Sequence, residues 1–159
     1  MILAIDIGNT NVTLGVYKND KFILTARLAT ETGRTSDQYA IDIKDVLALH
    51  GEDYKMIEGC VVSSVVPAVG EAIARGITAL CGVVPLVLGP GVKTGVNIKI
   101  DNPAQLGADL AAGAAGALGK YPMPCIIIDM GTATTLSVMD ESGAFLGGVI
   151  AAGVGLTLN

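Results

Sequence analysis

Two segments of the chain combine residue types that suit phosphate binding. Residues 6–11 read Asp-Ile-Gly-Asn-Thr-Asn, and residues 129–134 read Asp-Met-Gly-Thr-Ala-Thr. The glycine, which lacks a Cβ atom, lets the backbone approach an oxygen closely, and successive amides of such a turn can point at one anion. In the first segment the polar side chains at positions 9–11 add donors, and the carboxylate of Asp6 could hold Mg²⁺ directly or through water.

The repetition of this pattern is the reason to favour phosphate binding over an ordinary tight turn capped by an aspartate, which remains the alternative. Both segments follow an apolar, β-branched run and precede a hairpin, and Phe22 and Phe145 lie at the same offset from Asp6 and Asp129. Two copies of strand, Asp-Gly turn and hairpin predict a duplicated domain. Two unrelated turns could produce the same pattern by chance.

A third candidate is Asp109, which lies in a segment rich in glycine and alanine. Asn102 and Pro103 have the residue types of an N-cap and a first helical position, so we expect one helix from there to Leu118. Asp109 would then lie two turns into the helix, and the small side chains predict close packing. A carboxylate in that place could accept a proton from a substrate hydroxyl. A solvated helix carboxylate is the alternative.

Strands and helices that alternate along the chain must position these residues. Thr35 and Gln38 have the spacing of a capping box, which predicts a helix start, and residues 18–21 predict a hairpin turn. A break at residues 120–124 predicts a boundary between a first domain, residues 1–120, and the opening strands of a second, residues 121–159. The expected strands are 2–7, 12–17, 22–28, 61–66, 86–88, 125–128, 134–139 and 144–150, and a further helix is expected at 69–80.

Composition and charge restrict the class of protein. Hydrophobic residues make up 51% of the 159 residues and aromatic residues 4%, so the core must be aliphatic. The net charge of −5 gives no support for binding to nucleic acid or to an acidic membrane surface. Cys60, Cys81 and Cys125 form no CxxC pair, so we expect free thiols in a reducing cytoplasm. The chain shows no signal peptide, membrane span, Walker A loop or dinucleotide fingerprint.

Taken in order, the motifs resemble type III pantothenate kinases. They are residues 6–10, Asn102-Pro103 with residues 107–109, residues 129–134, and residues 147–150, and their order and spacing match over nearly the whole chain. That family belongs to the superfamily of acetate and sugar kinases, heat-shock ATPases and actin. The resemblance implies an α/β, ribonuclease-H-like (actin-like ATPase) fold. It has a mixed sheet with flanking helices and a duplicated domain, whose second copy is incomplete here.

The resemblance also implies an activity, namely ATP-dependent phosphorylation of the primary hydroxyl of pantothenate to 4′-phosphopantothenate, the first step of coenzyme A biosynthesis. Asp109 would be the general base, and Asp6 would hold Mg²⁺ through phosphate or water. Asp129 would bind a monovalent cation, K⁺ or NH₄⁺. The full-length protein would be a cytoplasmic homodimer. The residues implied to bind ATP phosphates are Asp6, Ile7, Gly8, Asn9, Thr10, Asn11, Val12, Thr13 and Thr132, and those implied to line the pantothenate site are Gly107, Ala108, Asp109 and Leu110.

This sequence departs from the family's usual pattern at three places and in its length. Leu110 stands where the family usually has Arg, Ile100 where it often has Tyr, and Ala152 where it usually has Pro before Gly153. Family members are much longer, so the resemblance implies a fragment with little activity of its own. Two other functions remain open. One is a sugar- or acetate-type kinase of the same superfamily, and the other is a non-catalytic nucleotide-binding regulator.

Overall fold

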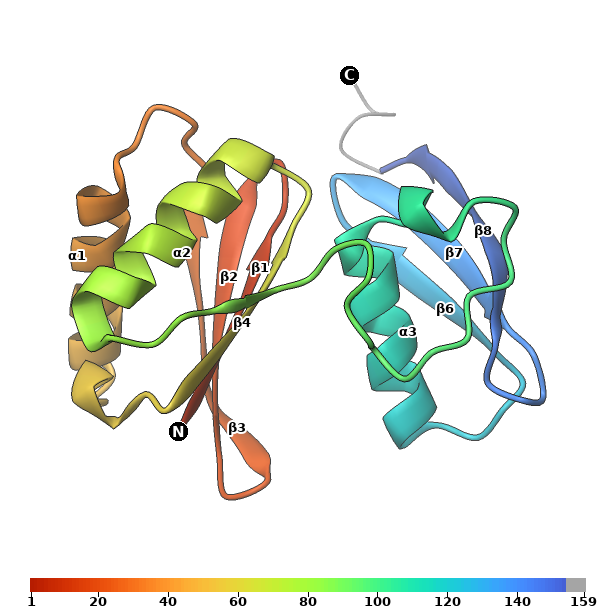
Figure 1. Ribbon diagram of the computed structural model, residues 1–159, viewed down its shortest axis with the longest axis horizontal. Helices are drawn as coiled ribbons and strands as arrows, with labels where there is room; N and C mark the ends of the chain where they lie inside the picture. The colour runs from red at the N-terminus through yellow and green to blue at the C-terminus, as the bar shows by residue number, and fades with distance from the viewer. Residues whose placement is uncertain (154–159) are drawn as a thin grey trace. The chain divides into compact units, whose positions relative to one another are not determined.

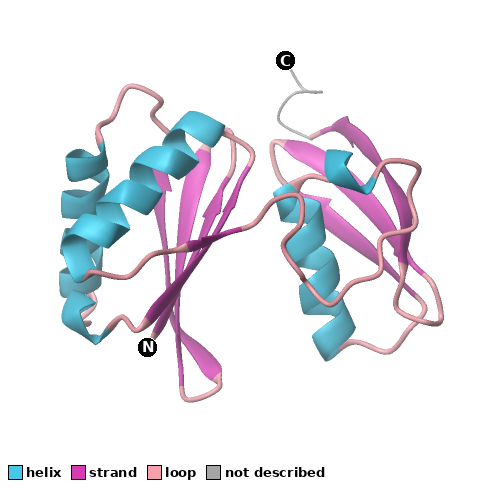
Figure 2. Cartoon of the chain, viewed as in Figure 1, coloured by secondary structure: helices cyan, strands magenta, loops and turns pink. Residues whose placement is uncertain are grey.

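The computed structural model describes residues 1–153, and the chain divides into two compact units, Met1–Leu88 and Gly89–Asn159 (Figure 1). The first unit holds a five-stranded sheet of order β3-β2-β1-β4-β5, and the second holds a three-stranded sheet of order β6-β7-β8 (Figure 2). No helix within residues 1–153 is long and apolar enough to cross a membrane.

The elements of the first unit are β1 (Ile2–Ile7), β2 (Asn11–Lys18), β3 (Lys21–Ala29), α1 (Ser36–Leu49), a 3₁₀ turn (Tyr54–Met56), β4 (Gly59–Ser64), α2 (Pro67–Cys81) and β5 (Leu86–Val87). Those of the second unit are a 3₁₀ turn (Pro103–Gln105), α3 (Ala108–Lys120), β6 (Cys125–Met130), β7 (Ala133–Met139) and β8 (Phe145–Ala152).

Strand β1 is the central strand of the first sheet, antiparallel to β2 and parallel to β4. Leu3, Ile5 and Ile7 are buried in one core with the apolar sides of α1 and α2, which both cover the same face of the sheet (Figure 1). Because successive side chains of a strand point to opposite faces, Asp6 lies on the face away from these helices. The apolar alternation of β1 thus fixes the direction of its carboxylate.

The predicted start of α1 is confirmed in detail. The Gln38 N–H donates to Thr35 Oγ1 at 3.3 Å, and the Thr35 N–H donates to Gln38 Oε1 at 2.9 Å, which is a complete capping box. Tyr39, Ile43 and Leu47, each four residues from the next and so on one side of the helix, are buried. The helix is therefore held by its cap at one end and by its apolar face along its length.

The predicted single helix over residues 103–118 is wrong. Residues 103–105 form one 3₁₀ turn, in which the Asn102 side chain accepts the N–H of Ala104 at 3.2 Å. The backbone at Leu106 and Gly107 is extended, and a separate helix, α3, begins at Ala108. The cap residues were recognised correctly, but a cap marks a helix start and carries no information on how long the helix is.

The glycines of α3 also differ from expectation. Ala114 and Ala117 are buried, whereas a Cβ atom placed on Gly113, Gly116 or Gly119 would meet no atom within 4 Å among the described residues. The close packing that was predicted for this helix is therefore limited to its alanine side.

The two units each contain a three-stranded antiparallel meander, β1-β2-β3 and β6-β7-β8. Asp6 pairs with Thr13 across its hairpin, and Asp129 pairs with Thr135. In both meanders the register shifts by a bulge just before the pair that contains the phenylalanine, Phe22 or Phe145. The shared local structure agrees with a duplication, which nevertheless stays a prediction because meanders also arise independently.

The boundary between the compact units lies at Leu88 and Gly89, earlier than the domain boundary predicted at residue 120. Helix α3 packs with β6 and β7 inside the second unit, around Ala114, Met139 and Phe145. Compactness in space does not show where a duplicated domain begins, so the boundary at residue 120 stays a prediction.

One face of the second sheet is apolar and exposed. Ile126, Ile128 and Met130 are 64%, 60% and 71% exposed, and Val138 on β7 lies opposite Ile126. In the first unit, the residues at the same distances before the turn are Leu3, Ile5 and Ile7, all buried under α1 and α2. The same strand pattern is therefore covered by helices in one unit and bare in the other.

Asp140 organises the turn between β7 and β8. Its Oδ1 accepts the Ser142 hydroxyl at 2.6 Å and the N–H groups of Ser142 and Ala144 at 2.9 Å, and Lys99 Nζ lies 3.0 Å from its Oδ2. These donors, with the Ser142 hydroxyl the strongest, hold the pKa of Asp140 well below its ordinary value.

We expect Asp140→Asn to lower the urea midpoint of unfolding at pH 7. Because the folded-state pKa lies below the unfolded-state value, the carboxylate stabilises the fold above about pH 4, and this contribution is lost as the pH falls through the folded-state pKa. The difference between Asp140→Asn and the unsubstituted chain should therefore shrink below about pH 4. Urea titrations at several pH values test this, with the exposed neighbour Glu141→Gln as control. A difference independent of pH would contradict it.

Candidate functional site

The loop after β1 is a fixed turn. The Gly8 N–H donates to Asn11 O at 2.9 Å, which closes the turn. Thr30, just after β3, donates from its hydroxyl to Gly8 O at 2.8 Å and from its N–H to Thr10 O at 3.0 Å. Thr30 thus binds two carbonyl oxygens of the loop, those of Gly8 and Thr10. The side chains of Asn9, Thr10 and Asn11 are exposed and can meet a ligand.

The predicted phosphate-binding residues 6–13 contribute in two ways. The side chains of Ile7 and Val12 are completely buried in the core, so only their backbone can meet a phosphate. Asp6 and Thr13 pair across the hairpin on the opposite face of the sheet, where Asp6 is exposed. The buried pair fixes the base of the turn, and the polar residues face outward from it.

Tyr39 secures the segment that holds the turn. Its buried hydroxyl accepts the Glu31 N–H at 3.0 Å and donates to Glu31 O at 2.9 Å. Arg34 lies 5.9 Å from the centre of the Tyr39 ring. Glu31 follows Thr30 directly, so the turn at residues 8–11 is tied through these two neighbouring residues to the first turns of α1.

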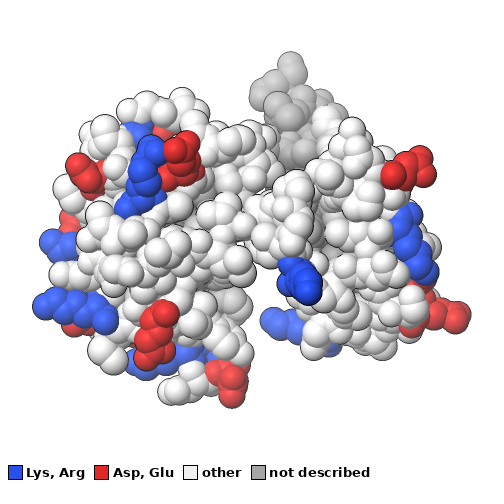
Figure 3. Space-filling view, in the orientation of Figure 1, with Lys and Arg blue, Asp and Glu red and all other residues white. Residues whose placement is uncertain are grey.

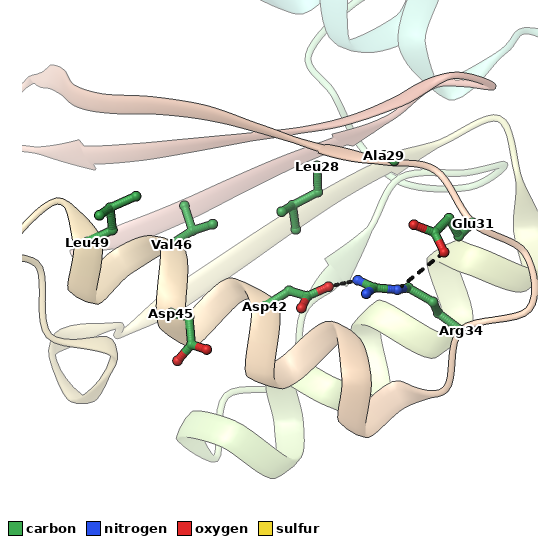
Figure 4. A pocket seen from close by; sticks show the side chains of 8 residues that line it. All are labelled: Leu28, Ala29, Glu31, Arg34, Asp42, Asp45, Val46 and Leu49. Atoms are coloured by element: carbon green, nitrogen blue, oxygen red, sulfur yellow. Dashed lines mark ion pairs between the residues drawn. The ribbon is translucent and has the colours of Figure 1, made fainter.

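A surface cavity of about 550 Å³ lies beside this anchor, between the end of β3 and α1 (Figure 4). Figure 4 shows Arg34 reaching toward Asp42, with which it forms an ion pair, and a second pair links Arg34 to Glu31 at 3.5 Å. None of the predicted site residues lines this cavity. Because Arg34 is already paired with Glu31 and Asp42, we infer that the residues around this cavity stabilise the connection between β3 and α1 and do not bind an anion.

The turn between β6 and β7 is closed in a similar way. The Gly131 N–H donates to Ala133 O at 2.9 Å, and the Gly153 N–H donates to Thr132 O at 3.1 Å. A Cβ atom on Gly153 would collide with the carbonyl oxygens of Gly131 and Thr132. Only glycine fits there, so Gly153 holds this turn as Thr30 holds the first. Asp129 and Thr132 themselves are exposed.

Asp109 lies in the first turn of α3, not two turns into a helix as predicted. Its Oδ1 accepts the N–H of Leu110 at 2.8 Å, and the carboxylate makes no other hydrogen bond or ion pair with residues 1–153. A Cβ atom on Gly107 would lie 2.5 Å from that oxygen, so glycine at position 107 makes room for the carboxylate. Asp109 is partly exposed, which leaves it accessible to a substrate.

The predicted metal ligands are single carboxylates. No group of three or more His, Cys, Asp or Glu residues that could hold a metal ion occurs in the described part of the chain. Magnesium in kinases is commonly bound by one or two carboxylates, with phosphate oxygens and water completing its shell, and exposed Asp6 fits that role. Asp129 likewise offers one exposed carboxylate to a cation.

The structure brings the site residues together only locally. Residues 6–13 form one cluster in the first unit, and residues 107–110, Asp129 and Thr132 lie in the second. On the face shown in Figure 3, basic and acidic side chains of the described residues are interspersed and form no basic patch.

Sequence reasoning missed Thr30. Its position gave no signal, because a threonine after a strand is unremarkable by itself. Its role depends on the antiparallel pairing of β2 and β3, which aligns Ala29 with Asn11 and so brings residue 30 beside the turn.

Solved structures with a similar fold define the class of the chain. The activator of the 2-hydroxyisocaproyl-CoA dehydratase from Clostridium difficile, with bound ADPNP, aligns with 95% of this chain and 45% of its own, at a TM-score of 0.56 and 17% identity. The ethanolamine utilization protein EutJ from Carboxydothermus hydrogenoformans aligns with 95% and 51%, at a TM-score of 0.52 and 17% identity. These likenesses confirm the predicted α/β fold of actin-like ATPases and sugar kinases, a mixed sheet with flanking helices.

Sequence comparison then gives the family. The family model of type III pantothenate kinases matches residues 2–159. A type III pantothenate kinase from Bifidobacterium animalis subsp. lactis (strain AD011) is 43% identical over 155 residues, which are 98% of this chain and 62% of that protein. The chain therefore belongs to the type III pantothenate kinase family, as the order of its motifs predicted, and spans 62% of the length of that relative.

We expect Thr30→Val to loosen the turn at residues 8–11, where phosphate binding is predicted, while preserving the shape of the side chain. It removes the hydroxyl donated to Gly8 O and should lower the free energy of unfolding by about 1 kcal/mol. The affinity for MgATP should fall roughly fivefold if the loosened turn costs the same amount again on binding. Urea unfolding and calorimetric titration measure the two effects. Thr25→Val, exposed on β3, is the matched control, and equal behaviour of both variants would contradict the role of Thr30.

Proposed function

We propose that the protein to which this chain belongs transfers the γ-phosphoryl group of ATP to the primary hydroxyl of pantothenate. The product is 4′-phosphopantothenate, at the first step of coenzyme A biosynthesis. The observation that carries the proposal is membership of the type III pantothenate kinase family over residues 2–159. The local geometry of the two Asp-x-Gly turns and of Asp109 supports it.

The first turn, residues 6–13, binds the ATP phosphates in this proposal. Its amide groups and the exposed side chains of Asn9, Thr10 and Asn11 supply donors, and Asp6 holds Mg²⁺ through phosphate or water. Thr132 contacts the nucleotide phosphates from the second turn. Phosphoryl transfer depends mainly on positioning and on neutralising charge, so two rigid turns suit it.

Asp109 acts as the general base. As the pantothenate hydroxyl attacks the γ-phosphorus, its proton passes to the carboxylate, and ADP leaves with the electrons of the broken P–O bond. Oδ1 is held by the Leu110 N–H, which fixes the orientation of the side chain. Residues 107–110 line the pantothenate site. Leu110 cannot pair with the pantothenate carboxylate, so in this proposal another residue of the full-length protein pairs with that charge.

The monovalent cation, the dimer and the cytoplasmic location are further parts of the proposal. K⁺ or NH₄⁺ binds at Asp129, and two copies of the full-length protein form a homodimer, as the family resemblance implies. Free thiols at Cys60, Cys81 and Cys125 support a reducing compartment. Burial, reinforced by the nearby Cys81, raises the pKa of the Cys60 thiol to about 12, so this thiol stays protonated and unreactive at neutral pH.

Asp109→Asn should reduce ATP-dependent phosphorylation of pantothenate by roughly 10²–10⁴-fold, the usual contribution of a general base. MgATP affinity should be unchanged, because Asp109 is assigned to the acceptor. Asp45→Asn, an exposed carboxylate on α1, is the control. A coupled assay of ADP release, run on the full-length protein that carries these residues, measures the effect. We expect little turnover from residues 1–159 alone.

The same assay with a panel of acceptors separates the competing functions. Turnover of a sugar or of acetate in place of pantothenate would assign the protein to another branch of the superfamily. Nucleotide binding without any acceptor would favour a regulator.

A further inference from the structure

Ser63 on β4 is a buried polar residue whose hydroxyl has no hydrogen-bond partner among the described residues. Its side chain is 5% exposed, and its Oγ makes no hydrogen bond to any of residues 1–153. Buried hydroxyl groups are nearly always hydrogen-bonded, because leaving one unpaired costs the free energy of its lost hydration. A partner that is not part of the described chain would remove this cost.

The neighbouring serine, Ser64, has a structural role, because its hydroxyl makes hydrogen bonds to the backbone. Ser64 Oγ donates to Val66 O at 2.9 Å and accepts the Val66 N–H at 3.1 Å, which ties the end of β4 to the start of α2. Gly70 of α2 lies against Ser64, since a Cβ placed there would be 3.0 Å from the serine. Ser63 makes no such hydrogen bonds with residues 1–153, and its side chain points to the opposite face of the sheet.

On that other face, Ser63 completes a row of polar residues. Asp6 pairs with Ser63 across the parallel strands β1 and β4, and with Thr13 across the antiparallel strands β1 and β2. Strands in a sheet lie about 4.8 Å apart, so the three side chains are direct neighbours. The row just before it consists of Gly15, Ala4 and Val61, which have no polar side chain.

The polar row lies where a ligand would meet it. It is the last row on its face of the sheet before β1 ends at Ile7, and the carboxyl ends of parallel strands are the usual place of ligand sites in α/β sheets. A row of Thr, Asp and Ser across three strands offers hydroxyl donors on both sides of the carboxylate assigned to Mg²⁺.

We propose that Ser63 is a positioning residue of the nucleotide site, whose hydroxyl donates a hydrogen bond to an oxygen that arrives with bound MgATP beside Asp6. That oxygen belongs to a phosphate or to a water molecule on Mg²⁺. The inference rests on the proposed nucleotide site in residues 6–13. It adds β4 to the elements that form the site, and it explains why a destabilising hydroxyl is kept in a buried place.

The test compares two serine variants of the full-length protein that carries these residues. Ser63→Ala should weaken MgATP binding roughly tenfold, the loss expected for one hydrogen bond to a charged group, while the urea midpoint stays the same or rises. Ser64→Ala should do the reverse, because it removes the tie to α2. Calorimetric titration and urea unfolding give the two readings for each variant.

Titration of ATP in EDTA distinguishes the two sources of the oxygen. A loss that persists without Mg²⁺ indicates a phosphate oxygen, and a loss seen only with Mg²⁺ indicates a water on the metal. Both results support the role of Ser63. Unchanged MgATP affinity in Ser63→Ala, or a fall in stability like that of Ser64→Ala, would overturn it while leaving the proposed function intact. Failure of the unsubstituted full-length protein to bind MgATP would overturn both.

Discussion

The alternation of side chains along β1 is the constraint on which the first unit depends. Leu3, Ile5 and Ile7 must enter the core under α1 and α2, because burying them supplies much of the apolar contact between sheet and helices. With those three fixed, Asp6 has no freedom of direction and must lie on the opposite face. A shift of one residue in register would bury the carboxylate and expose the core, so the fold and the orientation of the site are determined together.

The turns that follow β1 and β6 are alike in sequence but are held by different contacts. Thr30 fixes the first by a hydroxyl and an amide, and a chain of hydrogen bonds leads from its neighbour to Tyr39 on α1. Gly153 fixes the second by close backbone approach, where any side chain would collide. A turn of exposed polar residues needs other contacts to keep its shape. In each unit these contacts come from the residue that directly follows a later strand, Thr30 after β3 and Gly153 after β8.

The apolar faces of the two sheets carry the same strand pattern with different surroundings. In the first unit the pattern is buried by two helices, whereas Ile126, Ile128 and Met130 in the second are exposed. Apolar patches of this kind usually mark an interaction surface. The chain spans 62% of its relative. The proposed pantothenate site, where Leu110 stands in place of the arginine that the family resemblance implies, is the part that the local geometry defines least.

The sequence by itself determined the positions of the strands, the capped start of α1, the two Asp-x-Gly turns and the family, because alternation, cap residues and short motifs are local patterns. It did not reveal the break at Leu106 and Gly107, since a cap signal gives no helix length. Nor could it find Thr30, Gly153 or Ser63. Their roles arise from strand pairing between residues 22, 21 and 57 positions apart, and such pairing is decided only when the sheet forms.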